Sequence, residues 1–153
     1  MPNQSKIDEI CMKNAEEWRK LSKCNRNKVA CVIYNPSNNT IISVGYNGTP
    51  SGFPNECEGE HENVVTTPQE YTHWWVLHAE ANAIVKMAKD KWASTKDTWL
   101  YTTCSPCKEC SKLIVQAEIK RVIYKELYRD DPEKAMPGIH LMRDAGIDVT
   151  QME

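Results

Sequence analysis

Residues of the types that bind transition metals occur in two short motifs of this sequence. Cys107 and Cys110 are separated by two residues, and His78 begins an upstream His-Ala-Glu motif that ends at Glu80. Two thiolates and an imidazole suit tetrahedral zinc, and a site with three protein ligands keeps a fourth position open, as catalytic zinc sites do. Glu80 is then the carboxylate available to move a proton. The two motifs therefore predict a catalytic metal site rather than a structural one.

The cysteine pair is expected at the start of a helix. Ser105 is a suitable N-cap and Pro106 a suitable first helical residue, which would place Cys107 and Cys110 on one face of the first turn. Unpaired N–H groups at a helix start stabilise thiolates. A Cys-x-x-Cys pair alone also fits a redox pair, a zinc ribbon or packed thiols. Cys104 is a competing ligand at the same spacing, but it ends the expected strand and need not point the same way.

His78 and Glu80 constrain where the site lies. Residues two apart do not share a face of a helix, so both can serve one site only if it sits against the very start of their helix. We expect this helix to begin near residues 74–78 and to run to about residue 91, with Ala79 and Ala83 on its apolar face. The predicted site therefore lies where two helices begin.

Five segments are expected to form strands, at residues 29–34, 41–46, 98–103, 122–125 and 147–150. The first two are joined by a turn-rich loop and predict a hairpin. The last three alternate with helices, one after Cys110 and a short one from near Pro137 to Gly146, so they should pair in parallel. Asp130-Asp131-Pro132 is expected to form a turn. With a first helix over about residues 5–21, the prediction is an α/β fold with a five-stranded mixed sheet between helices.

Length and composition narrow the class of protein. A chain of 153 residues forms a single domain, here taken as residues 1–153. Its net charge of −2 and lack of a basic run argue against nucleic acid as a partner and for a small substrate. Without a long apolar run or a leader, we expect a soluble cytoplasmic protein without a membrane partner. Seven cysteines, an odd number, suit thiolate ligands better than a disulfide framework.

Beyond the residue types, the order of the motifs resembles a known enzyme family. His78-Ala79-Glu80 followed by Pro106-Cys107-x-x-Cys110 resembles the zinc-dependent nucleobase deaminases. With Gly-Tyr-Asn-Gly-Thr-Pro at residues 45–50, the chain from about residue 22 to its end resembles the deoxycytidylate deaminases. The resemblance implies a cytidine-deaminase-like fold, hydrolysis of dCMP to dUMP and ammonia, and assembly into hexamers.

The resemblance also implies roles for individual residues. Glu80 would carry the proton, and His78, Cys107 and Cys110 would bind the catalytic zinc. Substrate contacts would come from Asn47, Ala79 and Ser105. Apart from the resemblance, Tyr128 and Arg129 follow the fourth expected strand, where a substrate phosphate could be bound. A regulatory nucleotide, activating dCTP or inhibiting dTTP with Mg²⁺ on its phosphates, would contact Arg26, Lys28, Gly45, Tyr46, Asn47 and Gly48. The alternative for Asn47 is an ordinary turn residue, and for the two basic residues a solvated face.

The long loop at residues 48–68 needs an anchor or a function. Cys24, Cys57, His61 and His73 lie in or beside it and would satisfy a closed tetrahedral zinc site. The alternative is two free thiols and two solvated histidines. Some viral and bacterial deoxycytidylate deaminases carry a second, noncatalytic zinc in this region, so the resemblance favours a second zinc here.

Two other functions remain compatible with these motifs. One is a deaminase acting on a base in tRNA or single-stranded DNA, because the same His-x-Glu and Pro-Cys-x-x-Cys pattern serves that group. The other is a non-enzymatic, zinc-stabilised interaction module. A structural zinc site would use a fourth protein ligand and would not need Glu80. Inhibition by a transition-state mimic that binds an open zinc separates an enzyme from such a module.

Overall fold

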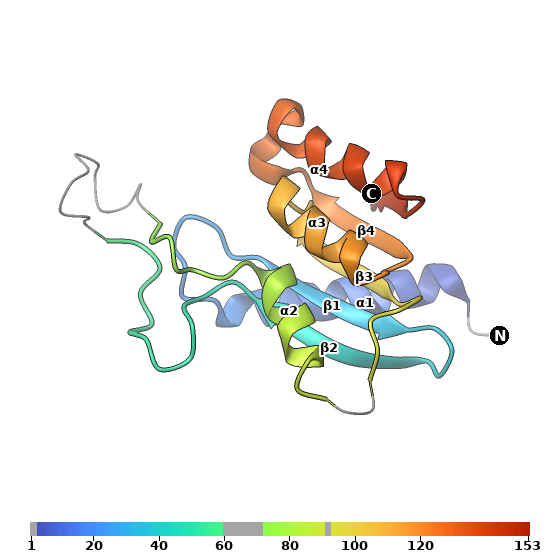
Figure 1. Cartoon of the computed structure of the whole chain (residues 1–153), viewed down its shortest axis with the longest axis horizontal. Helices are drawn as coiled ribbons and strands as arrows, with labels where there is room; N and C mark the ends of the chain where they lie inside the picture. Colours follow the sequence, from blue (N-terminus) through green and yellow to red (C-terminus); the bar gives the residue numbers. More distant parts are fainter. Residues whose placement is uncertain (1–2, 60–71, 91–92) are drawn as a thin grey trace.

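A five-stranded mixed sheet runs through the centre of the structure, a computed structural model in which residues 3–59, 72–90 and 93–153 are described (Figure 1). The strands are β1 (Ala30–Asn35), β2 (Thr40–Tyr46), β3 (Trp99–Cys104), β4 (Arg121–Glu126) and β5 (Asp148–Gln151). Their order in the sheet is β2-β1-β3-β4-β5. β1 pairs antiparallel with β2 and β3, whereas β3, β4 and β5 are parallel. The predicted hairpin and parallel half are both confirmed.

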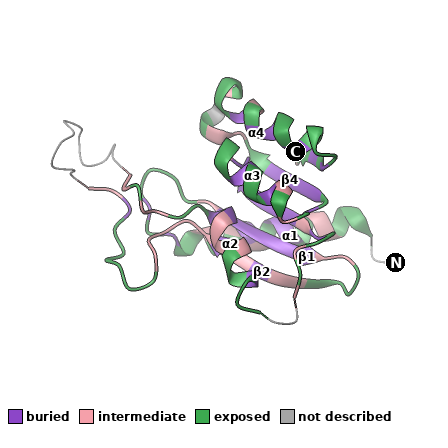
Figure 2. Ribbon diagram, viewed as in Figure 1, coloured by how far each residue is buried: buried purple, intermediate pink, exposed green. Residues whose placement is uncertain are grey.

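Helices cover both faces of this sheet. They are α1 (Gln4–Trp18), α2 (Ala79–Met87), α3 (Lys108–Gln116) and α4 (Pro132–Asp144), with 3-10 turns η1 (Arg19–Leu21) and η2 (Tyr128–Asp130). α1 packs on one face, and α2, α3 and α4 pack on the other (Figure 1). Buried residues concentrate on the central strands between these layers (Figure 2). In the described part of the chain, no helix is both long and apolar enough to span a membrane.

Side chains of β3 pack alternately against the helices on the two faces of the sheet. Tyr101 points to the α1 side, where it joins Met12 and Ala15, while Leu100 joins Ala79 on the side of α2. Alternate side chains of a strand point to opposite faces. Thr102, two residues after Leu100, therefore faces α2.

The contact between β2 and α2 is made by backbone atoms. A Cβ added at Gly45 would lie 2.2 Å from the Ala79 carbonyl oxygen and 2.6 Å from the Ala83 nitrogen. Gly45 is required because the helix approaches the strand too closely for any side chain. The hydroxyl of Ser43 donates to the Ala83 carbonyl at 2.7 Å and ties the same two elements together.

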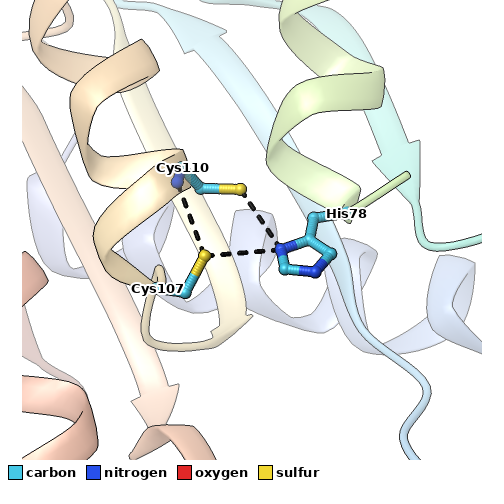
Figure 3. A group of neighbouring side chains, drawn as sticks. All are labelled: His78, Cys107 and Cys110. Carbon is cyan, nitrogen blue, oxygen red and sulfur yellow. Dashed lines mark hydrogen bonds between the residues drawn. The ribbon is translucent and has the colours of Figure 1, made fainter. Parts of the chain in front are cut away.

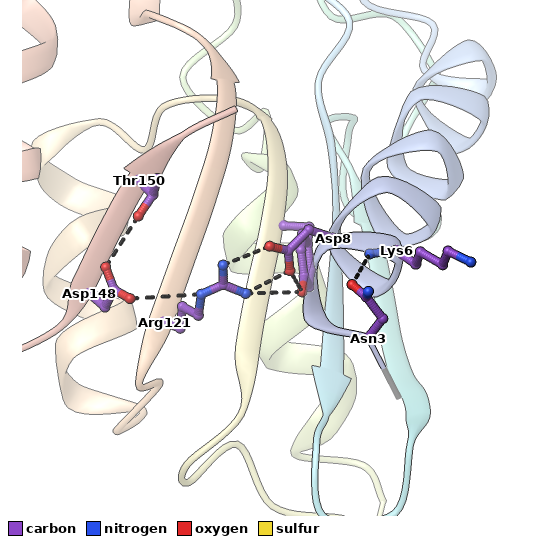
Figure 4. A network of polar contacts seen from close by, with 7 residues as sticks. Asn3, Lys6, Asp8, Arg121, Asp148 and Thr150 are labelled. Carbon is purple, nitrogen blue, oxygen red and sulfur yellow. Dashed lines mark hydrogen bonds and ion pairs between the residues drawn. The ribbon is translucent and has the colours of Figure 1, made fainter. Parts of the chain in front are cut away.

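A largely buried ion pair between Asp8 and Arg121 attaches α1 to the sheet. We call Asp8, Tyr101, Arg121 and Asp148 the arginine cluster, and Figure 4 labels Asp8, Arg121 and Asp148. Arg121 donates to both carboxylate oxygens of Asp8 at 2.6 and 2.7 Å, and the Tyr101 hydroxyl donates to Asp8 at 2.5 Å. The Arg121 Nε lies 3.8 Å from an Asp148 oxygen. A bidentate pair of this kind fixes orientation as well as distance.

Three predicted helix starts are corrected by the structure. α4 begins at Pro132, not near Pro137, because Asp131 is its N-cap and accepts from the Glu133 N–H at 3.0 Å. The sequence Asp-Pro was interpreted as a turn, but proline is equally suited to a first helical position. α2 begins at Ala79 with His78 as its extended N-cap, and it ends at Met87 rather than near residue 91. α3 begins at Lys108, with Cys107 and not Ser105 as its N-cap.

Candidate metal centre and catalytic pocket

His78, Cys107 and Cys110, here called the metal cluster, converge from two helix starts (Figure 3). The His78 Nδ1 lies 3.4 Å from the Sγ of Cys107 and 3.4 Å from the Sγ of Cys110. Among the described residues, this is the only group of three or more potential ligands whose donor atoms lie within 4.8 Å of one another. One imidazole nitrogen and two sulfurs are the donor set of a catalytic zinc site, so the residues fit that metal.

The first turn of α3 presents the two sulfurs, although not as the sequence predicted. Cys107, rather than Ser105, is the N-cap, and α3 begins at Lys108. The Sγ of Cys107 accepts from the Cys110 N–H at 3.4 Å. A helix N–H therefore does point at a sulfur, as expected. Ser105 does not cap the helix because its hydroxyl accepts from the Tyr128 N–H at 2.8 Å.

Because the two sulfurs lie close together, the pKa values of Cys107 and Cys110 shift in opposite directions. The hydrogen bond with Cys110 and, to a smaller extent, the contact with His78 together lower the pKa of the Cys107 thiol to about 4, against the opposing effect of burial. The same hydrogen bond, together with burial, raises the pKa of the Cys110 thiol. In the metal-free protein the two cysteines thus share one proton. A thiolate beside a neutral thiol is ready to bind a cation.

Glu80 lies on the second residue of α2, two residues after the N-cap His78. It is 4% exposed, and burial raises the pKa of its carboxyl group. His78 and Glu80 serve one site because the site lies against the helix start, as the spacing required. A buried carboxyl with a raised pKa is suited to exchange protons near neutral pH.

A cavity of about 360 Å³ opens beside these residues. His78, Glu80 and Cys107 form part of its wall, and the guanidinium-bearing residues Arg26 and Arg129 line it as well. A concave site with convergent polar groups and shifted pKa values is the usual form of an active site. Two arginines suit an anionic group on whatever small molecule binds there.

The predicted substrate contacts all reach this cavity. Ala79, Ser105, Tyr128 and Asn47 line it. The amide of Asn47 also has structural bonds: its Oδ1 accepts from the Ser22 hydroxyl at 2.8 Å and from the Val29 N–H at 2.9 Å. Asn47 thus holds the segment that precedes β1 while facing the cavity, and its contact with a substrate sugar stays a prediction.

Arg129 reaches the cavity through a backbone conformation that only a minority of residues adopt. Its φ is 56°, in the left-handed region, and its guanidinium lies 5.2 Å from the centre of the Tyr128 ring. Non-glycine residues in this conformation carry a cost and concentrate at functional sites. The bond from the Tyr128 N–H to Ser105 connects this segment directly to the cysteine motif.

The residues predicted to bind a regulatory nucleotide are dispersed. Arg26 lines the cavity and donates to the Thr72 hydroxyl at 3.3 Å, whereas Lys28 donates to the Ser22 carbonyl oxygen. The carbonyl of Tyr46 accepts from the Asn82 amide at 2.8 Å, and Gly48 pairs through its backbone with Leu77. The Gly-Tyr-Asn-Gly stretch, with Gly45 against α2, therefore connects β2 to the segment and helix that carry His78.

The predicted second zinc ligands are arranged differently from the expectation. Cys24 and Cys57 are joined by a disulfide, where the cysteine count had favoured thiolates. Chain segments distant in sequence meet here, because Glu58 accepts from the backbone N–H groups of both Asn25 and Arg26 at 2.8 and 2.9 Å. His73 bonds through its backbone to Cys57, and its ring stacks on Trp75 at 4.1 Å. His61 lies outside the described residues.

One residue beside the site, Thr102, was not predicted from the sequence. It lies on β3 with its hydroxyl 3.2 Å from the Oε1 of Glu80. Cys104, the competing ligand considered above, lines the cavity rather than joining the metal cluster. Thr102 was detectable in principle, because it is a polar residue at a strand position that faces α2.

Comparison with known proteins places these motifs in a family. Residues 5–126 match the sequence model described as the cytidine and deoxycytidylate deaminase zinc-binding region. Deoxycytidylate deaminase of Saccharomyces cerevisiae is 33% identical over 152 residues, covering 94% of this chain and 44% of the yeast protein. The chain thus spans less than half the length of that relative. The deoxycytidylate deaminase of Enterobacteria phage T4 is 32% identical, with 84% of this chain and 80% of the phage protein aligned.

A solved structure from the same family is similar to this chain in both fold and sequence. The crystal structure of dCMP deaminase from the cyanophage S-TIM5, in complex with dCMP and dUMP, has a TM-score of 0.83 and 39% sequence identity. The match covers 99% of this chain and 100% of the cyanophage chain. At this identity and coverage the likeness extends over the whole fold, including the part of the chain after residue 126.

Proposed function

The chain belongs to the cytidine and deoxycytidylate deaminase family, and from this premise we propose that it hydrolyses dCMP to dUMP and ammonia. The observation that carries the proposal is the metal cluster beside the buried Glu80, both facing one cavity. The cyanophage enzyme that resembles this chain was crystallised with dCMP and dUMP. Three protein ligands beside a carboxyl group are what a hydrolytic zinc site requires.

The metal cluster would hold zinc, which would supply the Lewis acidity that makes water nucleophilic near neutral pH. Glu80 accepts a proton from the water that attacks C4 of the cytosine ring and delivers it to the ring nitrogen. Glu80 then takes the proton of the new C4 hydroxyl and delivers it to the amino group. The bond from C4 to the amino nitrogen breaks as the C4 carbonyl forms, so dCMP and one water give dUMP and ammonia. Backbone carbonyl groups beside Ser105 receive the amino group before the reaction.

The nucleotide monophosphate is the proposed form of the substrate. Arg26 and Arg129 line the same cavity as Glu80, and two guanidinium groups suit a phosphate. Tyr128 and Asn47 complete the sugar and phosphate contacts. Free deoxycytidine lacks the anion that these arginines would bind and should be a much poorer substrate.

Regulation, assembly and a second metal are further parts of the proposal. dCTP would activate the enzyme and dTTP would inhibit it, each with Mg²⁺ on its phosphates. The enzyme would assemble as a hexamer and act in the cytoplasm, which is the host cytoplasm if the protein is viral. Large apolar side chains are exposed on several elements and would suit subunit contacts, among them Ile10, Leu21, Trp74, Val85 and Leu113. In a reducing environment the bond between Cys24 and Cys57 would open, and both thiolates with His61 and His73 would hold a second zinc.

Ammonia release from dCMP by zinc-loaded protein is the deciding experiment. Turnover of dCMP with little or none of deoxycytidine is expected, and dTTP with Mg²⁺ should reduce it. Absence of turnover with both compounds would contradict the proposal and direct the search to tRNA or single-stranded DNA. Metal analysis of reduced protein should give two zinc ions per chain, and a firm value of one would exclude the second site.

A further inference from the structure

The hydroxyl of Thr102 connects the proton-carrying carboxyl group to the strand that leads into the cysteine motif. Its one proton has two acceptors within hydrogen-bond distance of Oγ1, the Oε1 of Glu80 at 3.2 Å and the Cys104 carbonyl oxygen at 2.7 Å. Thr102 is fully buried, and Glu80 is nearly so. The contact is therefore protected from competing water.

A glutamate that carries protons has to present one oxygen in a fixed direction. The last torsion of a glutamate side chain is broad and roughly two-fold, so packing of its stem alone does not decide where each oxygen points. A hydrogen-bonding partner on Oε1 restricts this torsion. The other oxygen is then the one left to exchange protons with water and substrate.

The position of Thr102 also sets the carboxyl group relative to the metal cluster. Glu80 belongs to α2, whereas Cys107 and Cys110 belong to the segment that follows β3. Thr102 lies on β3 and contacts Glu80 on one side and the backbone of Cys104 on the other. One side chain thus spans the two elements whose relative placement the reaction requires.

From this arrangement we propose that Thr102 is a positioning residue for the deamination, which orients the carboxyl group of Glu80 through Oε1. The proposal rests on the proposed function, because it concerns the proton transfers assigned there to Glu80. Correct orientation of a catalytic group contributes to the rate of the chemical step and little to ground-state binding. Loss of the hydroxyl should therefore lower kcat and leave KM nearly unchanged.

The test compares Thr102→Val with Thr103→Val, which removes a hydroxyl from the neighbouring buried residue of the same strand. The Thr103 Oγ1 accepts from the Ala30 N–H at 3.2 Å, away from Glu80. Thr102→Val should lower kcat for dCMP about tenfold, Thr102→Ser should restore most of it, and Thr103→Val should keep kcat within about twofold. The visible spectrum of the Co²⁺-substituted protein should be the same in all four proteins, because Thr102 does not act on the metal ligands.

Several results would overturn the proposal. These are a Thr102→Val enzyme within twofold of the wild-type kcat, equal losses in the two valine variants, or an altered Co²⁺ spectrum in Thr102→Val alone. Should Thr102→Val not fold, Thr102→Ala is judged by the same limits. A double-mutant cycle of Thr102→Val with Glu80→Ala measures the contact through the free energy of unfolding. The loss of stability in the double variant should be smaller than the sum of the losses in the two single variants. If the wild-type protein does not turn over dCMP, both the proposed function and the role of Thr102 are wrong. If the stability losses in the cycle are additive, only the contact of Thr102 with Glu80 is contradicted.

Discussion

The arginine cluster and the metal cluster lie on opposite faces of the same sheet, and they treat buried polar groups in different ways (Figures 3 and 4). In the arginine cluster, a cation meets two carboxylates and a phenol, so the positive charge of Arg121 is neutralised by residues of the chain itself. The metal cluster gathers two sulfurs and an imidazole beside the carboxyl group of Glu80. Its electron-pair donors are balanced only when a cation is added. The first arrangement attaches α1 to the sheet, and the second presents donor atoms to a cation.

Glu80→Gln should give the largest effect and the sharpest contrast between the clusters. The amide cannot accept and return a proton, so kcat for dCMP should fall by about 10²–10⁴-fold, as for other acid–base residues. Zinc content and thermal stability should be unchanged, because Glu80 is not a ligand. Steady-state kinetics and metal analysis of one preparation test this, and near wild-type turnover would remove the role of Glu80.

Asp8→Asn should have the opposite profile. It leaves Arg121 buried without its bidentate carboxylate, and removal of one partner of a buried ion pair costs about 3–5 kcal/mol. Denaturant unfolding should detect this loss of stability. Below the unfolding transition, kcat should match the wild type. A large drop in kcat in the folded protein would show that the two faces are coupled rather than separate.

Gly138→Ala should disturb the metal cluster by pushing α4 against the turn that carries Cys107. A Cβ at this position of α4 would lie 2.5 Å from the Ser111 Oγ and 2.8 Å from the Pro106 carbonyl oxygen, so the cysteine turn must shift. We expect zinc affinity to fall about tenfold, in the range seen for changes to the residues that support metal ligands. Competition with a chromogenic chelator measures this. Lys134→Ala, an exposed change on the same helix, is the control and should leave the affinity unaltered.

The smallest expected effect is a difference between two cysteines in their rate of reaction with a thiol reagent. The pKa of Cys107 is lowered to about 4, mainly by the hydrogen bond with Cys110, while burial raises that of Cys11, which packs under α1, to about 11. At pH 7 the metal-free protein should therefore react with iodoacetamide at Cys107 at least about tenfold faster than at Cys11. Added zinc should protect Cys107. Peptide mass spectrometry follows both sites, and equal rates would contradict the proposed difference in acidity.

The parts of this molecule that follow a local rule were predictable from sequence. Alternation and turn residues identified five strands and their pairing, and the spacing of His78, Cys107 and Cys110 indicated which residues the structure brings together. The N-cap of α3 was not predictable, because the choice between Ser105 and Cys107 depends on the distant Tyr128 N–H. The same holds for the Cys24–Cys57 bond, whose partners come from distant segments. Strand alternation indicates the face on which Thr102 lies, but its contact with Glu80 depends on how α2 packs against β3. Contacts between elements decide these features.

Gly45 has a consequence for how sequences of this kind can diverge. Because main-chain atoms of β2 and α2 touch there, the depth at which α2 sits on the sheet has a hard limit that core side chains do not determine. Smaller residues in the core around α2 therefore cannot let the start of the helix sink further onto β2. The depth of the helix start is limited at one glycine, and a side chain at that position would push the helix, with the residues that begin it, away from the sheet.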